Sequence, residues 1–127
     1  MKKVIHTANA PAAIGPYSQA IQLGNLVFCS GQIPLDPASG QTVGGDDVAA
    51  QTVQVMKNIE AVLAAANLKF SNIVKTTIFI TDMKDFPTVN EIYGKHFPEN
   101  PPARSTVAVA GLPKGVKVEI EVLAAQG

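Results

Sequence analysis

The residues with the clearest chemical potential lie near the end of the chain, in the segment 101–123. This segment predicts two strands around a turn, because β-branched residues are frequent in both arms and glycine and proline lie between them. Side chains alternate between the two faces of a strand, so Arg104 shares a face with Thr106, and Glu119 lies opposite the apolar face of the second arm. If the faces of Arg104 and Glu119 coincide, both lie on the side away from the main hydrophobic core.

The chemistry available to this pair is recognition of an acid and activation of water. A guanidinium offers paired donors that match a carboxylate or a phosphate, so Arg104 at the start of a half-buried strand suits a small acidic ligand. A partly desolvated Glu119 can act as a general base on water. The simpler alternative is an ion pair of Arg104 with Glu119 or Glu121 on a neighbouring strand, since structural ion pairs are common. The pattern alone leaves both interpretations open.

Other residue types with catalytic potential have weaker support. Ser30 lacks a recognisable base or nucleophile elbow, which argues against a covalent serine mechanism. Cys29 alternates with Ser30 and is expected to be a small core residue. His6 and His96 lie far apart in the sequence, with no helical H-x-x-x-H and no cysteine partner, so no metal site is predicted.

The composition indicates a single domain, residues 1–127, that assembles with other copies. Charged residues make up 16% of the chain and hydrophobic residues 46%, which leaves little charge for a fully solvated surface. Ten basic and ten acidic residues cancel, so neither nucleic acid nor an anionic membrane is an expected partner. A single cysteine favours a reducing compartment, and the sequence shows no secretory signal or membrane-length apolar run. We therefore expect a soluble cytoplasmic protein.

Hydrophobic periodicity predicts six strands and two helices in the order β-β-β-α-β-α-β-β. Strands are expected at 3–6, 18–23, 26–30 and 72–81 and in the two arms of 101–123, and helices at about 47–66 and from Asp85 onward. The 18–23 and 26–30 strands form a hairpin about Gly24-Asn25. Because a right-handed helical crossover is the default connection, strands 26–30 and 72–81 are expected to pair in parallel.

Two helices can cover only one face of such a sheet, so the other face is expected to meet another subunit. Ala108, Ala110 and Leu123 would make this uncovered face partly apolar. Arg104 and Glu119 then lie in a candidate cleft between subunits.

Two further polar residues have more than one possible role. Asn90 falls inside the second predicted helix, where it serves either as an inward polar group or as a solvent-facing side chain. Tyr17 follows a proline in a rigid loop, and is either a packing residue or a lid.

Four segments together resemble the RidA/YjgF family of reactive imine deaminases, and the resemblance extends over nearly the whole chain. They are A-P-A-A-I-G-P-Y-S-Q-A at 10–20, C-S-G-Q-I-P at 29–34, I-V-K-T-T-I-F-I-T-D-M at 73–83 and P-A-R-S-T-V-A-V-A-G-L-P-K-G-V-K-V-E-I-E at 102–121. The resemblance implies a chorismate-mutase-like α+β fold, with a six-stranded mixed sheet and two helices on one face. It also implies a homotrimer with three clefts between subunits.

The activity that the resemblance implies is hydrolysis of 2-imino acids, such as 2-iminobutanoate and 2-iminopropanoate, to 2-oxo acids and ammonia, without a metal or an organic cofactor. By matching motif, Arg104 would hold the substrate carboxylate and Glu119 would position or activate the water. The residues implied to line the cleft are Tyr17, Ser30, Gly31, Asn90 and Thr106.

The chain departs from the family pattern at three positions. Thr106 stands where the archetype commonly has cysteine, and Ala108 and Gly111 stand at positions that are usually charged. The first departure argues against a thiol-dependent role at this position, and the other two concern subunit contacts.

Two other functions remain as alternatives. Thr106 keeps open a non-catalytic regulatory trimer that binds small carboxylates. An endoribonuclease or translation inhibitor is the third possibility, although the neutral net charge and the lack of a plausible catalytic histidine pair argue against it.

Overall fold

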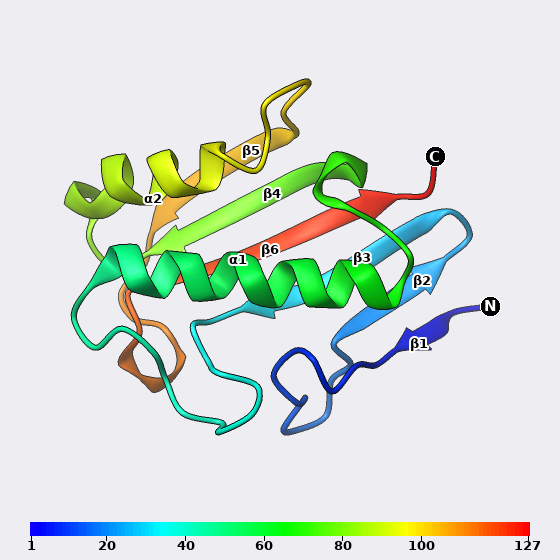
Figure 1. Ribbon diagram of the computed structural model, residues 1–127, viewed down its shortest axis with the longest axis horizontal. Coiled ribbons are helices and arrows are strands. Elements are labelled where there is room, and N and C mark those ends of the chain that lie inside the picture. The colour runs from blue at the N-terminus through cyan, green and yellow to red at the C-terminus, as the bar shows by residue number, and fades with distance from the viewer.

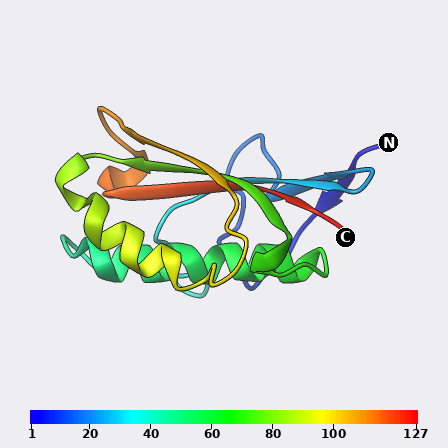
Figure 2. The same ribbon diagram turned by 90° about the horizontal axis from the view of Figure 1, so that it is seen from above.

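The chain folds into two layers, a six-stranded sheet and a pair of helices that cover the same face of it (Figure 1, Figure 2). The computed structural model describes all residues, 1–127. The strands are β1 (Lys3–Ile5), β2 (Ala20–Leu23), β3 (Leu26–Gln32), β4 (Ile73–Ile80), β5 (Ala103–Ala108) and β6 (Val118–Ala125), and the helices are α1 (Val48–Ala65) and α2 (Phe86–Gly94). Short 3-10 turns precede β4, α2 and β6, namely η1 (Phe70–Asn72), η2 (Met83–Asp85) and η3 (Pro113–Gly115). The predicted element order and α+β class are confirmed.

Helix α1 begins where the sequence provides a side-chain cap. The Asp47 carboxylate accepts hydrogen bonds from the N–H groups of Ala49 and Ala50 at 3.0 and 3.4 Å. These bonds satisfy donors that the first helical turn leaves free. Beyond the other end, Asn67 takes a left-handed conformation with a φ of 60°. The predicted helix at 47–66 is therefore confirmed to within one residue at each end.

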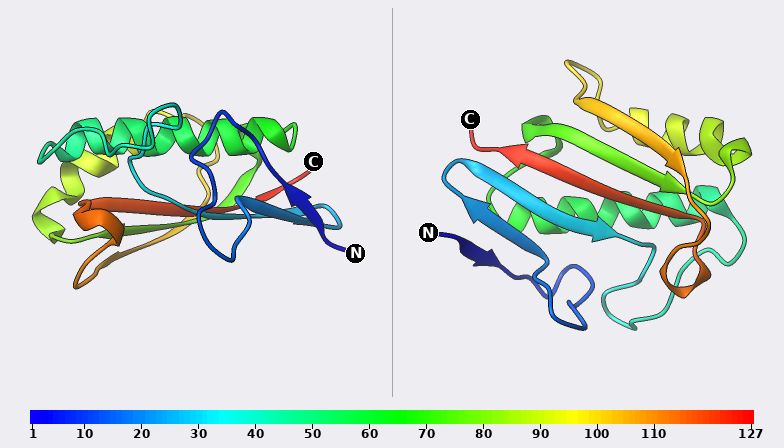
Figure 3. Two further views of the ribbon diagram at one scale, coloured as in Figure 1. Left: turned by 90° about the horizontal axis from the view of Figure 1, so that it is seen from below. Right: turned by 180° about the vertical axis from the view of Figure 1, so that it is seen from behind.

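The strand order across the sheet is β1-β2-β3-β6-β4-β5 (Figure 3). Strands β2 and β3 form the predicted hairpin about Gly24-Asn25, with Leu23 opposite Leu26. Strand β6 pairs antiparallel with both β3 and β4, and β5 pairs in parallel with β4. The prediction that strands 26–30 and 72–81 pair directly is wrong: they run in the same direction, but β6 lies between them. Strands β5 and β6, expected as two strands around a turn, are likewise separated by β4.

Burial of β6 explains why the last strand takes an interior place. Its inward residues Val118, Ile120, Val122 and Ala124 are each at most 5% exposed. Helix α1 packs against both β6 and β3, so the crossover helix covers the inserted strand as well. An antiparallel strand with one continuous apolar face is most stable where strands flank it on both edges and a helix covers that face.

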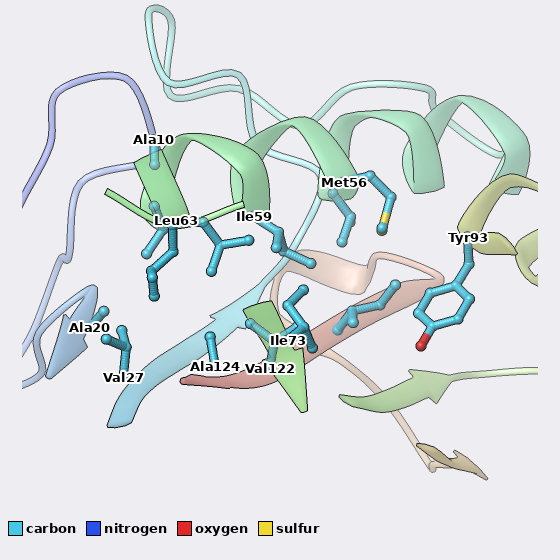
Figure 4. Close-up of a cluster of buried hydrophobic side chains, with 14 of the residues drawn as sticks. Ala10, Ala20, Val27, Met56, Ile59, Leu63, Ile73, Tyr93, Val122 and Ala124 are labelled. Carbon is cyan, nitrogen blue, oxygen red and sulfur yellow. The ribbon is translucent and has the colours of Figure 1, made fainter. Parts of the chain in front are cut away.

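The core fills the space between the helices and the sheet. Met56, Ile59 and Leu63 point from α1 toward the sheet (Figure 4), where they join Val122 and Ala124 of β6 in one buried cluster. The three helical side chains are at most 2% exposed. Burying each such side chain contributes roughly 1.5–3 kcal/mol, and this packing fixes the orientation of the strands that carry the polar candidates.

The sheet register assigns each polar candidate to a face. Thr76 of β4 is buried under α2 and pairs with Arg104 of β5, so Arg104 lies on the helix-covered face. Glu119 of β6 pairs with Phe79 of β4, which alternates with the buried Ile78, so Glu119 lies on the uncovered face. The prediction that Arg104 and Glu119 share a face is therefore wrong within one chain. The reason is that β4 separates their strands and sets each register independently.

The uncovered face is partly apolar, as predicted. Phe28 and Val107 remain 44% and 41% exposed on it, and Leu123 pairs with Phe28 across β3 and β6. Ala108 does not lie on this face, because it pairs with the buried Ile80 of β4. Ala110 lies beyond the end of β5. Neither helix combines the length and hydropathy that a membrane crossing requires.

Candidate active site

An irregularity at the end of β3 exposes two of the predicted site residues. The pairing of β3 with β6 shifts register between Cys29 and Gln32, so that Ser30 and Gly31 interrupt the regular ladder. The Ser30 hydroxyl donates a hydrogen bond to the Ser18 carbonyl at 2.6 Å, and the Ser30 N–H donates to the Gln19 carbonyl at 2.9 Å. Because its proton goes to a backbone carbonyl and not to a base, the Ser30 hydroxyl is not activated as a nucleophile.

Gly31 is required by the close approach of the Glu119 side chain. A Cβ atom at position 31 would overlap Glu119 Oε2 and lie 2.9 Å from Glu119 Cδ. The carboxylate of Glu119 therefore lies directly against the backbone of the β3 irregularity. Any larger residue at position 31 would force the carboxylate out of its position.

The environment of Glu119 favours a carboxyl group that can take up a proton. Burial raises the pKa of the Glu119 carboxyl above its ordinary value of 4.5, and the nearby charge of Glu121 raises it further. A half-buried carboxylate with a raised pKa is a stronger base than a solvated one. The geometry and electrostatics of Glu119 thus suit general-base chemistry on a water molecule.

Four of the predicted residues line one cavity of about 480 Å³, namely Tyr17, Ser30, Gly31 and Glu119. The N-terminal loop contributes Pro11, Ala12 and Ile14 to its wall, and η3 contributes Pro113 and Lys114. A cavity of this size is ample for an amino-acid-sized ligand. Tyr17 stands at the rim and is 54% exposed, after a turn in which Gly15 takes a φ of 125°.

Sequence reasoning missed Gln19, which fastens the N-terminal loop over this cavity. Gln19 is 2% exposed, and its side-chain amide donates to the carbonyls of Thr7 and Pro11 at 3.0 and 2.8 Å. Its side-chain oxygen accepts from the Thr7 N–H at 2.7 Å. The sequence contains a signal for this role, namely the position of Gln19 next to a proline-rich loop with few N–H donors. A glutamine there can donate to backbone carbonyls that have no partner strand.

Arg104 and Asn90 lie together on the other face of the sheet. Nη1 of Arg104 donates to Oδ1 of Asn90 at 2.6 Å, and the two residues line a second cavity of about 430 Å³ between α2 and the start of β5. Thr106 follows on the same face of β5, paired with Ile78. Because the partner of Arg104 is a neutral amide, the positive charge of the guanidinium is not compensated by that contact.

The seven predicted site residues thus form two groups on opposite faces of one chain. Tyr17, Ser30, Gly31 and Glu119 form the first group, and Asn90, Arg104 and Thr106 form the second. The alternative of an ion pair between Arg104 and Glu119 or Glu121 is wrong, since both glutamates project from β6 onto the uncovered face.

Cys29 and the histidines do not form a catalytic or metal-binding group with other side chains. Cys29 packs against the core, as predicted, and burial raises the pKa of its thiol to about 12, which leaves it unreactive. His96 packs on the Phe70 ring, with 4.5 Å between ring centroids. The structure contains no group of three or more His, Cys, Asp or Glu side chains arranged to hold a metal ion.

Comparison with known proteins places the chain in a family. A family model described as Endoribonuclease L-PSP matches residues 7–126. Protein DfrA of Myxococcus xanthus is 57% identical over 125 residues, which cover 97% of this chain and 95% of that protein. The 2-iminobutanoate/2-iminopropanoate deaminase of Salmonella typhimurium is 53% identical over 127 residues, covering 98% of each chain.

The fold agrees with these sequence relationships. The crystal structure of E. coli TdcF with bound serine matches with a TM-score of 0.92 at 45% identity, covering 98% of this chain and 99% of that one. The chain therefore belongs to the Endoribonuclease L-PSP family, which is the RidA/YjgF family that its sequence motifs indicated.

Proposed function

We propose that this protein hydrolyses 2-imino acids, such as 2-iminobutanoate and 2-iminopropanoate, to 2-oxo acids and ammonia. The observation that carries the proposal is the pair of half-sites, a cavity with a half-buried carboxylate and a separate cavity with an uncompensated guanidinium. These are the two groups that hydrolysis of an acidic imine needs. Relatives about half identical over the full chain are named as deaminases of these substrates.

The two half-sites meet only if two copies of the chain come together. Arg104 and Glu119 project from opposite faces of the sheet, so one chain cannot present both to one ligand. The exposed apolar side chains on the uncovered face give a second copy a surface to bury. We propose a closed ring of three copies, in which each chain gives Arg104 to one cleft and Glu119 to the next.

In such a cleft, Arg104 of one copy would bind the substrate carboxylate through paired N–H donors. Asn90 keeps that guanidinium in place without cancelling its charge. Serine in the crystal structure of TdcF is a ligand of the same size and also carries a carboxylate. The ligand class of the cleft is thus a small α-substituted acid.

Glu119 of the other copy would activate the water. The carbon of a protonated imine next to a carboxylate is electrophilic, so the enzyme has to place a water about 3 Å from that carbon and accept its proton. As the C–O bond forms, the π bond of the C=N group breaks, and the product is a carbinolamine that keeps its C–N single bond. The carboxyl proton then passes to the amine, the C–N bond breaks, and the departing ammonia takes the hydroxyl proton to leave the 2-oxo acid.

Two other functions account for fewer of these features. A regulatory trimer that binds small carboxylates without turnover would use Arg104, and Thr106 beside it is the departure that favours this function. The family's endoribonuclease name is harder to reconcile with a net charge of zero. His6 follows the edge strand β1, whereas His96 packs on Phe70 beside β4, so the histidines form no catalytic pair.

The proposal is tested by supplying the imine from threonine dehydratase or an amino-acid oxidase and trapping it with semicarbazide. We expect the purified protein to lower the yield of semicarbazone and to speed the formation of 2-oxo acid. Semicarbazone yields that are equal with and without the protein would reject the proposed activity. Binding of 2-oxobutanoate without any turnover would favour the regulatory function instead.

A further inference from the structure

One face of helix α2 surrounds the guanidinium of Arg104. Phe86, Asn90 and Tyr93 follow one another at spacings of four and three residues, so their side chains project from the same side of the helix. That side is turned toward β5, which carries Arg104 next to β4. Three neighbouring contacts to Arg104 thus come from a single helix.

The two aromatic contacts are equally close. Cζ of Arg104 lies 5.2 Å from the centroid of the Phe86 ring and 5.2 Å from the centroid of the Tyr93 ring. Both distances are within the range in which a guanidinium is attracted to the face of an aromatic ring. Two rings and one short hydrogen bond restrict a long, flexible side chain to a small set of rotamers. The contact with Asn90 uses one of five N–H donors, so the other four remain for a ligand.

Tyr93 is itself fixed by the sheet. Its hydroxyl points from α2 toward the strands (Figure 4) and lies 2.8 Å from the hydroxyl of Thr76, and both residues are at most 4% exposed. Burial raises the pKa of the Tyr93 phenol, which keeps this hydroxyl in its neutral form. Thr76 pairs with Arg104 in the parallel ladder, so Thr76, Tyr93 and Arg104 form a closed set of contacts across β4, α2 and β5.

We propose that Phe86 and Tyr93, with Thr76 behind Tyr93, are positioning residues that hold the Arg104 guanidinium in the orientation that binds a carboxylate. The proposal deepens the proposed function and rests on it for the identity of the ligand. The positioning residues are not expected to touch the reacting atoms. Their loss widens the range of orientations of Arg104 and weakens the binding of the acid, while the bound substrate still meets Glu119.

The test compares Phe86→Leu with Phe70→Leu. Phe70 contacts His96 and Phe97, and Phe97 in turn contacts Tyr93. Phe70 packs against the core as Phe86 does, but among the aromatic rings only Phe86 and Tyr93 contact the guanidinium, so Phe70 is a matched control for loss of a ring. We expect Phe86→Leu to raise the Kd of 2-oxobutanoate, and the KM for the imine, by about 3- to 10-fold. Phe70→Leu should leave both constants within about twofold of wild type, and kcat should change little in either variant.

Tyr93 provides a second comparison, in which Tyr93→Phe keeps the ring and Tyr93→Leu removes it. Tyr93→Phe keeps the ring but loses the hydrogen bond to Thr76, so it should weaken binding by less than Tyr93→Leu. Tyr93→Leu should weaken binding as Phe86→Leu does. Thermal unfolding of each variant measures general destabilisation. Loss of a packed ring is expected to lower the unfolding midpoint in Phe70→Leu as well as in Phe86→Leu, whereas only Phe86→Leu should lose binding. An unchanged Kd in Phe86→Leu, or an equal loss of binding in Phe70→Leu, would overturn the positioning role.

The binding measurement separates this inference from the proposed function. If Phe86→Leu weakens binding of 2-oxobutanoate but the wild-type protein does not hydrolyse the imine, the positioning role stands and the deaminase function fails. If the wild type hydrolyses the imine and Phe86→Leu has an unchanged KM, the function stands and the positioning role fails. Failure of the wild-type protein to bind 2-oxobutanoate would overturn the assignment of a carboxylate site to Arg104.

Discussion

Arg104→Ala lowers kcat/KM for 2-iminobutanoate by about 100-fold or more, because removing one partner of a charge-assisted pair costs several kcal/mol. The guanidinium has no acidic partner within its own contacts, and Asn90 leaves its charge available for a ligand. The loss is expected mainly in KM, since the carboxylate is bound in both the ground state and the transition state. The coupled imine assay with semicarbazide measures it.

Arg104→Lys is the matched control for the shape of the cation. Lysine keeps the charge but lacks the planar fork, and it stacks less well between Phe86 and Tyr93. We expect an intermediate loss, on the order of 10-fold in kcat/KM. Wild-type kinetics in Arg104→Ala would show that the substrate carboxylate is bound elsewhere.

Glu119→Gln lowers kcat by about 100- to 10,000-fold, the range that general-base catalysis contributes. Glutamine preserves the size of the side chain against Gly31 but cannot accept the proton of the attacking water. KM is expected to change far less than kcat, because Arg104 supplies the binding charge. Glu121→Gln is the matched control, since Glu121 lies on the same face of β6 but outside the Glu119 cavity. A kcat in Glu119→Gln close to that of wild type would exclude Glu119 as the base.

The raised pKa of Glu119 fixes the sign of two pH effects. The base is lost as the carboxylate takes up a proton, so kcat/KM falls on the acid side with a midpoint above 4.5. Glu121→Gln removes one cause of the shift and should move that midpoint to lower pH. The fold disfavours the ionised form of Glu119. The free energy of unfolding of the wild type therefore falls as pH rises through the folded pKa of this carboxyl group. Glu119→Gln should therefore unfold at a slightly higher temperature than wild type at neutral pH.

The sequence predicted the elements of the fold better than their arrangement. Turn residues and apolar periodicity correctly indicated six strands, two helices and the hairpin about Gly24-Asn25, because these features depend on local chemistry. Two predicted strand pairings were wrong. Strand β6 lies between β3 and β4, and β4 lies between β5 and β6. Strand order depends on which apolar faces bury best together, and a single sequence pattern does not contain that information.

Most of the predicted site residues line cavities, but the faces on which they lie were not predicted correctly, because those faces depend on strand order. The family motifs identified residues that line cavities in this structure, including Ser30, Gly31 and Glu119 in one and Arg104 in another. Alternation along each strand gave two faces, but only the register with β4 determined that Arg104 and Glu119 point in opposite directions. Because that register separates the two groups, the proposed function places the active cleft between two copies of the chain.

The most direct test is to refold two impaired variants, Arg104→Ala and Glu119→Gln, together at equal concentration and to assay the mixture at a substrate concentration well below the wild-type KM. In a closed ring with a cleft between each pair of neighbours, random assembly gives about a quarter of the clefts an intact Arg104 from one copy and an intact Glu119 from the next. We predict that the mixture recovers about a quarter of wild-type activity, whereas each variant refolded alone has about a hundredth of it or less. Activity in the mixture no greater than the mean of the two variants would contradict a cleft shared between subunits.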